Sequence, residues 1–170
     1  DDTGNACAPA RTDAGSVLVF ERSGSAFAPT PMASFWGPQA SQQISTLTSA
    51  DMNGDGVSDL IIGGPAWDRP SVGGVALWWG GAGVAGNACS PAATVLGVAA
   101  SDALGTSIER LGDIDGDGCE EVAVGAVQFD PPGVSNAGAV YVWWGFGPGC
   151  SAAEPMLSAI SPLNAGAQAG

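Results

Sequence analysis

Two stretches of the chain repeat each other at a spacing of about 60 residues, and this repeat limits the folds open to the chain more than any other feature. Residues 51–63 read DMNGDGVSDLIIG, and residues 113–125 read DIDGDGCEEVAVG. A second pattern follows each of them, GGVALWWGG at residues 73–81 and AGAVYVWWGFG at residues 137–147. A third copy of this second pattern, AGSVLVFERSG, occupies residues 14–24. The chain is therefore expected to fold as a row of equivalent units.

Each complete repeat contains four short runs of residues that are typical of β-strands. The apolar runs at 60–62 and 122–124 end at glycine, as buried central strands often do. The runs at 75–79 and 140–144 are rich in β-branched and aromatic residues. Weaker runs flank them, at residues 44–48, 94–98, 107–111 and 156–160. The 27 glycines and 12 prolines indicate many turns and little helix.

Four short antiparallel strands per unit are typical of β-propeller blades, so the predicted fold is all-β with about two complete blades and partial blades at the ends. We expect the outer half of a blade within residues 1–39 and complete blades at 40–101 and 102–160. Residues 161–170 are expected to begin a further repeat or to form a tail. Because closed propellers have about four to eight blades, the chain is interpreted as a fragment of a longer protein. A ring completed by partner chains, a β-solenoid and a small sandwich are the alternatives.

The charge balance excludes several classes of function. The chain carries 17 acidic and 4 basic residues, a net charge of −13, and it has no histidine. Binding of nucleic acid or of anionic lipid is not expected, because both need clustered Lys and Arg. Triads that use histidine, cysteines activated by histidine, and zinc sites with histidine ligands are excluded. No apolar run is long enough to insert into a membrane, and the first residues lack the basic and apolar regions of a signal peptide.

The two Asp-rich loops, at residues 51–59 and 113–121, carry the chemistry of the sequence. Oxygen side chains stand at the first, third and fifth positions, with glycines at the fourth and sixth that let the backbone curl. The seventh position can offer its backbone carbonyl, and the ninth adds a carboxylate. Such a shell favours Ca²⁺ over the smaller Mg²⁺. The predicted ligands of two calcium sites are Asp51, Asn53, Asp55, Val57 (carbonyl) and Asp59 in the first loop, and Asp113, Asp115, Asp117, Cys119 (carbonyl) and Glu121 in the second.

An EF-hand shares part of this loop pattern but is excluded. It needs a bidentate Glu at the twelfth position and flanking helices. The twelfth position here is Ile62 in one copy and Val124 in the other, both inside predicted strands. Plain Asp-Gly turns are the remaining alternative. We favour calcium sites because the two copies match at five ligand positions.

The pattern D-x-[ND]-G-D-G-x-x-[DE]-[LV]-x-[IV]-G-[GA], followed by G-x-V-x-[LV]-[WY], resembles the FG-GAP repeats of integrin α-subunit propellers and of related bacterial surface propellers. The resemblance covers about residues 14–160. Leu104-Gly105 stands in place of the family's opening Phe-Gly in the second repeat, and Gln42-Gln43 in the first. In that family each loop binds Ca²⁺ in the hairpin between the first two strands of a blade. The resemblance therefore implies the same ligand sets and two bound calcium ions.

The tryptophan pairs at residues 78–79 and 143–144 have two interpretations. Adjacent residues of a strand face opposite ways, so at most one of each pair packs between blades. Core packing is favoured over a stacking platform for a sugar or a peptide. The loop at residues 65–70, with Trp67, and its equivalent at residues 129–132 lie where integrin-like propellers bind partners. We favour a rigid loop without a ligand over a partner contact.

The chain has four cysteines, Cys7, Cys89, Cys119 and Cys150. None are spaced as CxxC, which argues against zinc and thioredoxin-like sites. In a secreted calcium protein four cysteines indicate two disulfides. Cys119 and Cys150 fall in loops at the same end of one antiparallel blade, so we favour Cys119–Cys150 and Cys7–Cys89. A Cys89–Cys119 bond between blades and four free thiols are the alternatives.

These features predict a non-catalytic, calcium-stabilised adhesion or scaffold module that is extracellular or on the cell surface. Calcium would hold the hairpins rigid while loops at the opposite end contact a protein or a glycan. One alternative is a structural subunit of a surface fibre or layer, in which copies of the chain assemble through exposed sheet edges. The other is the propeller portion of a secreted hydrolase, in which carboxylates such as Asp68 and Asp130 act as acid and base.

Overall fold

The computed structural model of this protein describes residues 15–36, 43–67, 72–81, 84, 90–99, 101–131 and 137–160. Every element with defined bounds in these ranges is a β-strand, so the prediction of an all-β fold is confirmed. Within the same ranges no helix has the length and apolar character needed to span a bilayer. Cys7, Cys89, Asp68, Gln42 and the segment 161–170 lie outside the described residues.

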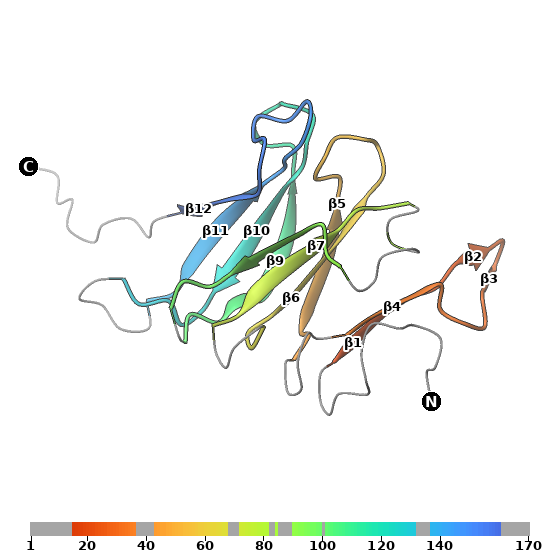
Figure 1. Ribbon diagram of the computed structural model, residues 1–170, viewed down its shortest axis with the longest axis horizontal. Helices are drawn as coiled ribbons and strands as arrows, with labels where there is room; N and C mark the ends of the chain where they lie inside the picture. The colour runs from red at the N-terminus through yellow and green to blue at the C-terminus, as the bar shows by residue number, and fades with distance from the viewer. Residues whose placement is uncertain are drawn as a thin grey trace, which may run out of the picture.

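Two four-stranded antiparallel sheets stand side by side and correspond to the two complete repeats (Figure 1). In each sheet the strands are paired in chain order. The first contains β5 (Thr46–Ala50), β6 (Asp59–Gly64), β7 (Gly74–Trp78) and β8 (Ala93–Leu96). The second contains β9 (Leu104–Gly112), β10 (Glu121–Ala126), β11 (Ala139–Trp144) and β12 (Met156–Ile160). The prediction of propeller-type blades with four short strands per repeat is therefore confirmed.

The N-terminal strands form a smaller sheet beside the first blade. Strands β1 (Ser16–Val19) and β4 (Ala33–Trp36) pair antiparallel. Between them, β2 (Arg22–Ser23) and β3 (Ala26–Phe27) form a short hairpin that extends away from the sheets (Figure 1). The sequence patterns had not indicated this hairpin.

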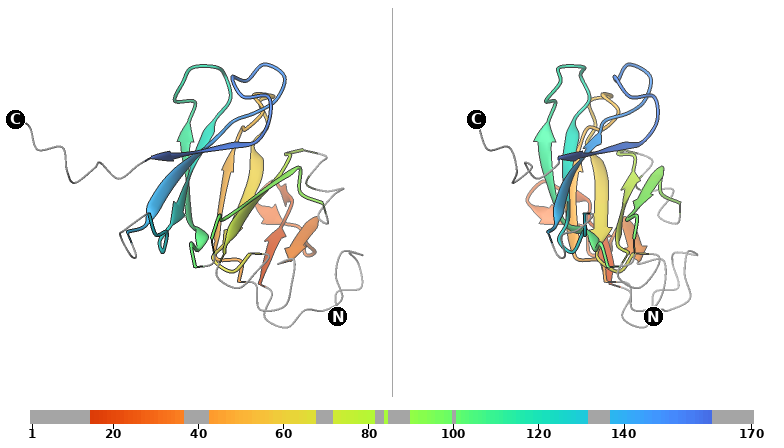
Figure 2. Two further views of the ribbon diagram at one scale, coloured as in Figure 1. Left: turned by 60° about the vertical axis from the view of Figure 1, so that its left-hand side comes forward. Right: turned by 90° about the vertical axis from the view of Figure 1, so that its left-hand side faces the viewer.

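The first blade is covered on both faces, because it lies between the N-terminal sheet and the second blade (Figure 2). Adjacent residues of β6 show this arrangement. Ile61 packs into the cluster shared with the second blade, and Ile62 into the cluster shared with the N-terminal sheet. Both side chains have no exposed surface. Strands of this kind need apolar residues on both faces, which explains the unbroken apolar runs of β6 and β7.

The tryptophan pairs follow the same geometry. Trp78 is buried against Phe35 of β4, with ring centroids 4.9 Å apart, whereas Trp79 turns to the other face and packs against Phe146 at 5.3 Å. Trp143 is fully buried, and Trp144 is half-buried. Core packing of the tryptophans is confirmed. The prediction that at most one member of each pair packs between blades is wrong for the first pair, because Trp78 and Trp79 contact the sheets on opposite sides of the first blade.

The two blades meet closely at the start of β7. Gly73, which has a φ of +75°, pairs with Leu104 across the junction in a single parallel bridge. The Leu104 amide donates to the Val72 carbonyl at 3.2 Å, and the Gly97 amide donates to the Gly73 carbonyl at 3.0 Å. Backbone therefore contacts backbone here, with no room for a side chain between the blades.

Candidate metal centre

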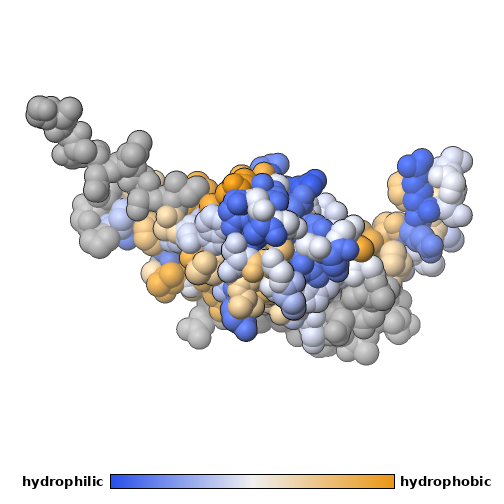
Figure 3. Space-filling view, turned by 90° about the horizontal axis from the view of Figure 1, so that it is seen from above, coloured by the Kyte–Doolittle hydropathy of each residue, from blue (hydrophilic) through white to orange (hydrophobic). Residues whose placement is uncertain are grey.

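Both Asp-rich loops are hairpins between the first two strands of their blades, as the sequence predicts. Residues 51–58 connect β5 to β6, and residues 113–120 connect β9 to β10. The hairpins project from the same end of the two sheets (Figure 1). Seen from that end, hydrophilic residues gather over the middle of the molecule (Figure 3).

The first carboxylate of each hairpin organises the turn that follows it. Asp51 accepts hydrogen bonds from the amides of Asp55 (3.0 Å) and Gly56 (2.8 Å). Asp113 accepts the two equivalent bonds, at 3.1 and 3.0 Å, in the second hairpin. The glycines at the fourth and sixth positions have φ values between +70° and +93°, which glycine adopts without strain. The two loops thus adopt one conformation, and their glycines serve the purpose that the sequence indicated.

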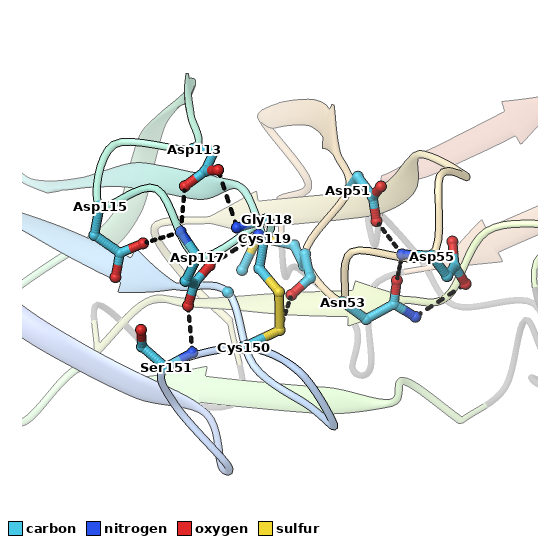
Figure 4. The surroundings of a disulfide bond; sticks show 12 residues. Asp51, Asn53, Asp55, Asp113, Asp115, Asp117, Gly118, Cys119, Cys150 and Ser151 are labelled. Atoms are coloured by element: carbon cyan, nitrogen blue, oxygen red, sulfur yellow. Dashed lines mark hydrogen bonds between the residues drawn. A yellow bond between two sulfur atoms is a disulfide. The ribbon is translucent and has the colours of Figure 1, made fainter.

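Three carboxylates converge in the second hairpin. Asp113, Asp115 and Asp117 each have an oxygen within 4.8 Å of the others (Figure 4). In the first hairpin Asn53 takes the place of Asp115, and its side-chain oxygen accepts a bond from the Asp55 amide at 3.1 Å. Hard oxygen donors in this arrangement fit a Ca²⁺ ion. The second hairpin carries the greater negative charge.

The ninth position has a role that sequence reasoning missed. Asp59 is buried, with 1% of its surface exposed, and it accepts bonds at 2.8 Å from the amides of both Met52 and Gly80. Glu121 accepts the equivalent bonds from Ile114 (2.8 Å) and Gly145 (3.3 Å). Each of these acids ties its hairpin to the glycine that follows the tryptophan pair. The signal available in the sequence was the glycine after each Trp-Trp, because only a small residue lets the backbone approach so closely.

Burial changes the acidity of these two anchors. It raises the pKa of Asp59 from 3.8 to about 6, against the opposing effect of its two amide donors. Burial also raises the pKa of Glu121. Two other acids of the second hairpin, Asp117 and Glu120, have lowered pKa values. A hydrogen bond from the Ser151 amide lowers the pKa of Asp117, and a hydrogen bond from Arg110 lowers the pKa of Glu120.

In the absence of calcium, the free energy of unfolding is expected to rise as the pH falls from about 7 to about 5, by about 1 kcal/mol from Asp59 alone. A carboxyl whose pKa is raised by folding binds its proton more tightly in the folded state, so acidification favours that state across the range between 6 and 3.8. Asp117 and Glu120, whose pKa values are lowered, lose their contributions only at more acid pH.

Urea unfolding in a chelator at the two pH values measures this effect. Asp59→Asn, which cannot ionise, is the control and should reduce the difference. A fold that is less stable at about pH 5 than at about pH 7 would contradict the effect of the buried carboxyls.

The seventh position differs between the hairpins. Val57 is exposed, whereas Cys119 is buried and forms a disulfide with Cys150 in the β11–β12 connection. The amides of Val57 and Cys119 each donate to the preceding Asp at 2.8 Å. The predicted Cys119–Cys150 pairing is confirmed and the alternative Cys89–Cys119 bond is wrong, whereas the partner proposed for Cys89 lies outside the described residues.

The loops with Trp67 and Asp130, at the end of the blades opposite the Asp-rich hairpins, give little support for a ligand site. Trp67 is buried, with 6% of its surface exposed, and it packs into the core on the side of the N-terminal sheet. The burial of Trp67 agrees with the interpretation of this loop as rigid, because its indole fills space beside Gly74. Asp130 is exposed, but its proposed companion Asp68 lies outside the described residues.

Comparison with known proteins places these features in a family. A model of the FG-GAP repeat matches residues 44–78 and 107–143, so each match contains one Asp-rich hairpin. The chain is 32% identical over 120 residues to phosphatidylinositol-glycan-specific phospholipase D of Homo sapiens, and equally to that of Bos taurus. The matched region is 66% of this chain but 14% of each relative.

Proposed function

The chain carries two FG-GAP repeats of the integrin-like β-propeller family, and on that premise we propose that it is a non-catalytic propeller module that binds calcium in both Asp-rich hairpins. The observation that carries this proposal is the convergence of three carboxylates in the second hairpin. Carboxylates held so close repel one another unless a cation lies between them. The first hairpin repeats the same backbone bonds with one amide in place of a carboxylate.

The ligands proposed for the two ions are the ten residues predicted from the sequence. The side chains at the first, third and fifth positions support this assignment most directly, because they are exposed or half-buried and turn into the loop. Asp59 and Glu121, at the starts of β6 and β10, would add to the negative charge of each site while they anchor the hairpin. Calcium would neutralise this charge and stiffen the hairpin.

We place the module outside the cell or on its surface. The Cys119–Cys150 disulfide supports this location, because such bonds persist mainly in oxidising compartments. The ligand would be a protein or a glycan bound by an adhesion or scaffold surface, or further copies of this chain in a fibre or layer. The named relatives favour a second candidate, the propeller portion of a hydrolase, in which case catalysis would reside outside the region matched here.

Calcium titration by calorimetry tests the proposal. We expect two bound ions per chain, reduced to one by either Asp55→Asn or Asp117→Asn, since each change removes a charged ligand from one hairpin. Glu109→Gln, on the exposed face of β9, is the matched control and should leave both ions bound. The absence of calcium binding by the unmodified chain at millimolar calcium would overturn the proposal.

A further inference from the structure

The connection between β11 and β12 reaches over the second Asp-rich hairpin and touches Asp117 (Figure 4). The Ser151 amide donates a hydrogen bond to Oδ2 of Asp117, and the Ser151 side chain bonds to the same carboxyl. On the other side of this carboxylate, Oδ1 accepts the Cys119 amide at 2.8 Å. Both oxygens of Asp117 are therefore held by backbone donors.

The Cys119–Cys150 disulfide links the two chain segments that carry these donors. One amide belongs to Cys119 itself, and the other belongs to the residue that follows Cys150. The covalent bond thus keeps the hairpin and the β11–β12 connection in the relative position that fixes Asp117. Groups that orient metal ligands in this way commonly set the affinity of a site.

The first hairpin lacks this arrangement and provides an internal comparison. Its seventh position is Val57, so no disulfide can form there. The second oxygen of Asp55 is contacted by the side chain of Asn53, at 3.1 Å, which belongs to the same loop. The disulfide lies beside the first hairpin, where the Cys150 sulfur is 3.8 Å from the Met52 carbonyl oxygen and Glu120 bonds to the backbone of Asp51. The donors to the carboxylates of Asp51 and Asp55 nevertheless belong to the first hairpin itself.

We propose that Ser151, held in place by the Cys119–Cys150 disulfide, positions Asp117 for the metal ion of the second hairpin, so that the calcium affinity of this hairpin depends on the disulfide. This inference rests on the proposed calcium binding. It adds that the disulfide affects the calcium affinity of one of the two sites. Loss of the bond frees the connection to move away, and Asp117 then loses the donors that orient it. The first hairpin keeps its own donors.

Calorimetric titration with Ca²⁺ in single-site chains tests the inference. The Asp55→Asn chain reports the second hairpin, and the Asp117→Asn chain reports the first. In the Asp55→Asn chain, replacing both Cys119 and Cys150 by serine should weaken calcium binding by about 10- to 100-fold, the usual effect of removing a group that orients a metal ligand. In the Asp117→Asn chain the same double replacement should change the affinity by less than about threefold.

A second measurement covers the case in which the serine variant fails to fold. The Asp55→Asn chain is folded with its disulfide intact and then treated with a phosphine. The phosphine takes oxygen from water and becomes a phosphine oxide, while each sulfur gains a hydrogen to give two thiols. The same loss of affinity is expected after this cleavage.

Ser151 is tested separately by two substitutions in the Asp55→Asn chain. Ser151→Pro removes the amide donor, keeps the disulfide and should weaken binding by about tenfold or more. Ser151→Ala keeps that donor and should have a smaller effect. Equal calcium affinity of the second hairpin with and without the disulfide would overturn the inference and leave the proposed function intact. If the unmodified chain bound no calcium, both would fail.

Discussion

Removal of calcium is expected to lower the melting temperature of this protein by about 10 °C or more. An ion that binds only the folded state stabilises it by about 3–4 kcal/mol per site when free calcium exceeds the dissociation constant about a hundred- to a thousandfold. In a chain of this size each kcal/mol corresponds to about 2–4 °C. Without the ions, the clustered carboxylates of the second hairpin repel one another, and this adds to the loss.

The measurement is a pair of thermal scans, one in millimolar calcium and one in a chelator that leaves magnesium free. A chain carrying both Asp55→Asn and Asp117→Asn is the control, and its melting temperature should respond much less to the chelator. A melting temperature of the unmodified chain that the chelator leaves unchanged would show that calcium does not stabilise the fold.

Gly73→Ala is expected to destabilise the protein by about 3 kcal/mol or more. The φ of Gly73 is +75°, a conformation that costs alanine about 1–2 kcal/mol. A β-carbon at this position would also lie 2.2 Å from the Leu104 carbonyl oxygen and 2.4 Å from the Leu104 nitrogen. Because both atoms belong to backbone, the two blades would have to move apart, and the packing between them would be lost.

Urea unfolding followed by tryptophan fluorescence measures this loss. Gly24→Ala is a matched control, because Gly24 has a similar φ of +62° and a β-carbon there would have no atom within 4 Å. It should cost about 1 kcal/mol, the effect of the backbone conformation alone. If both substitutions had the same effect, the close contact at the blade junction would not matter for stability.

The strands and the hairpins could be predicted because their signals are local. Alternating or unbroken apolar runs depend on neighbouring residues, and the Asp-Gly pattern lies within nine consecutive positions. The weaker runs were predicted unevenly: the run at 156–160 coincides with β12, but others are shifted or too short. The first strand of the second blade was expected at residues 107–111 but extends over Leu104–Gly112. Its beginning is set by contacts with the preceding blade at Gly73, which no local pattern reports.

Two of the missed features depend on partners distant in the chain. The anchoring role of Asp59 and Glu121 was missed because their carboxylates bond to Gly80 and Gly145, which follow strands far along the chain. Asp102 was missed although its partners are local: it is buried and accepts hydrogen bonds from the amides of Val98 (3.0 Å) and Ala99 (2.7 Å) in the link between the blades. An acid that stabilises a turn and one that binds a metal are the same residue type in a sequence.

The burial of both faces of β6 has a consequence for how the chain selects its strand pairing. In a sheet with one exposed face, a slip of one residue would bring apolar side chains into water, and this penalty fixes the register. Ile61 and Ile62 are equally buried, so that penalty is weak in β6. The register must then come from the turn, where Ala50 is placed opposite Asp59. The Asp-rich hairpin is thus expected to fix the register of β5 and β6. Calcium bound in the hairpin is expected to favour the correctly paired sheet during folding.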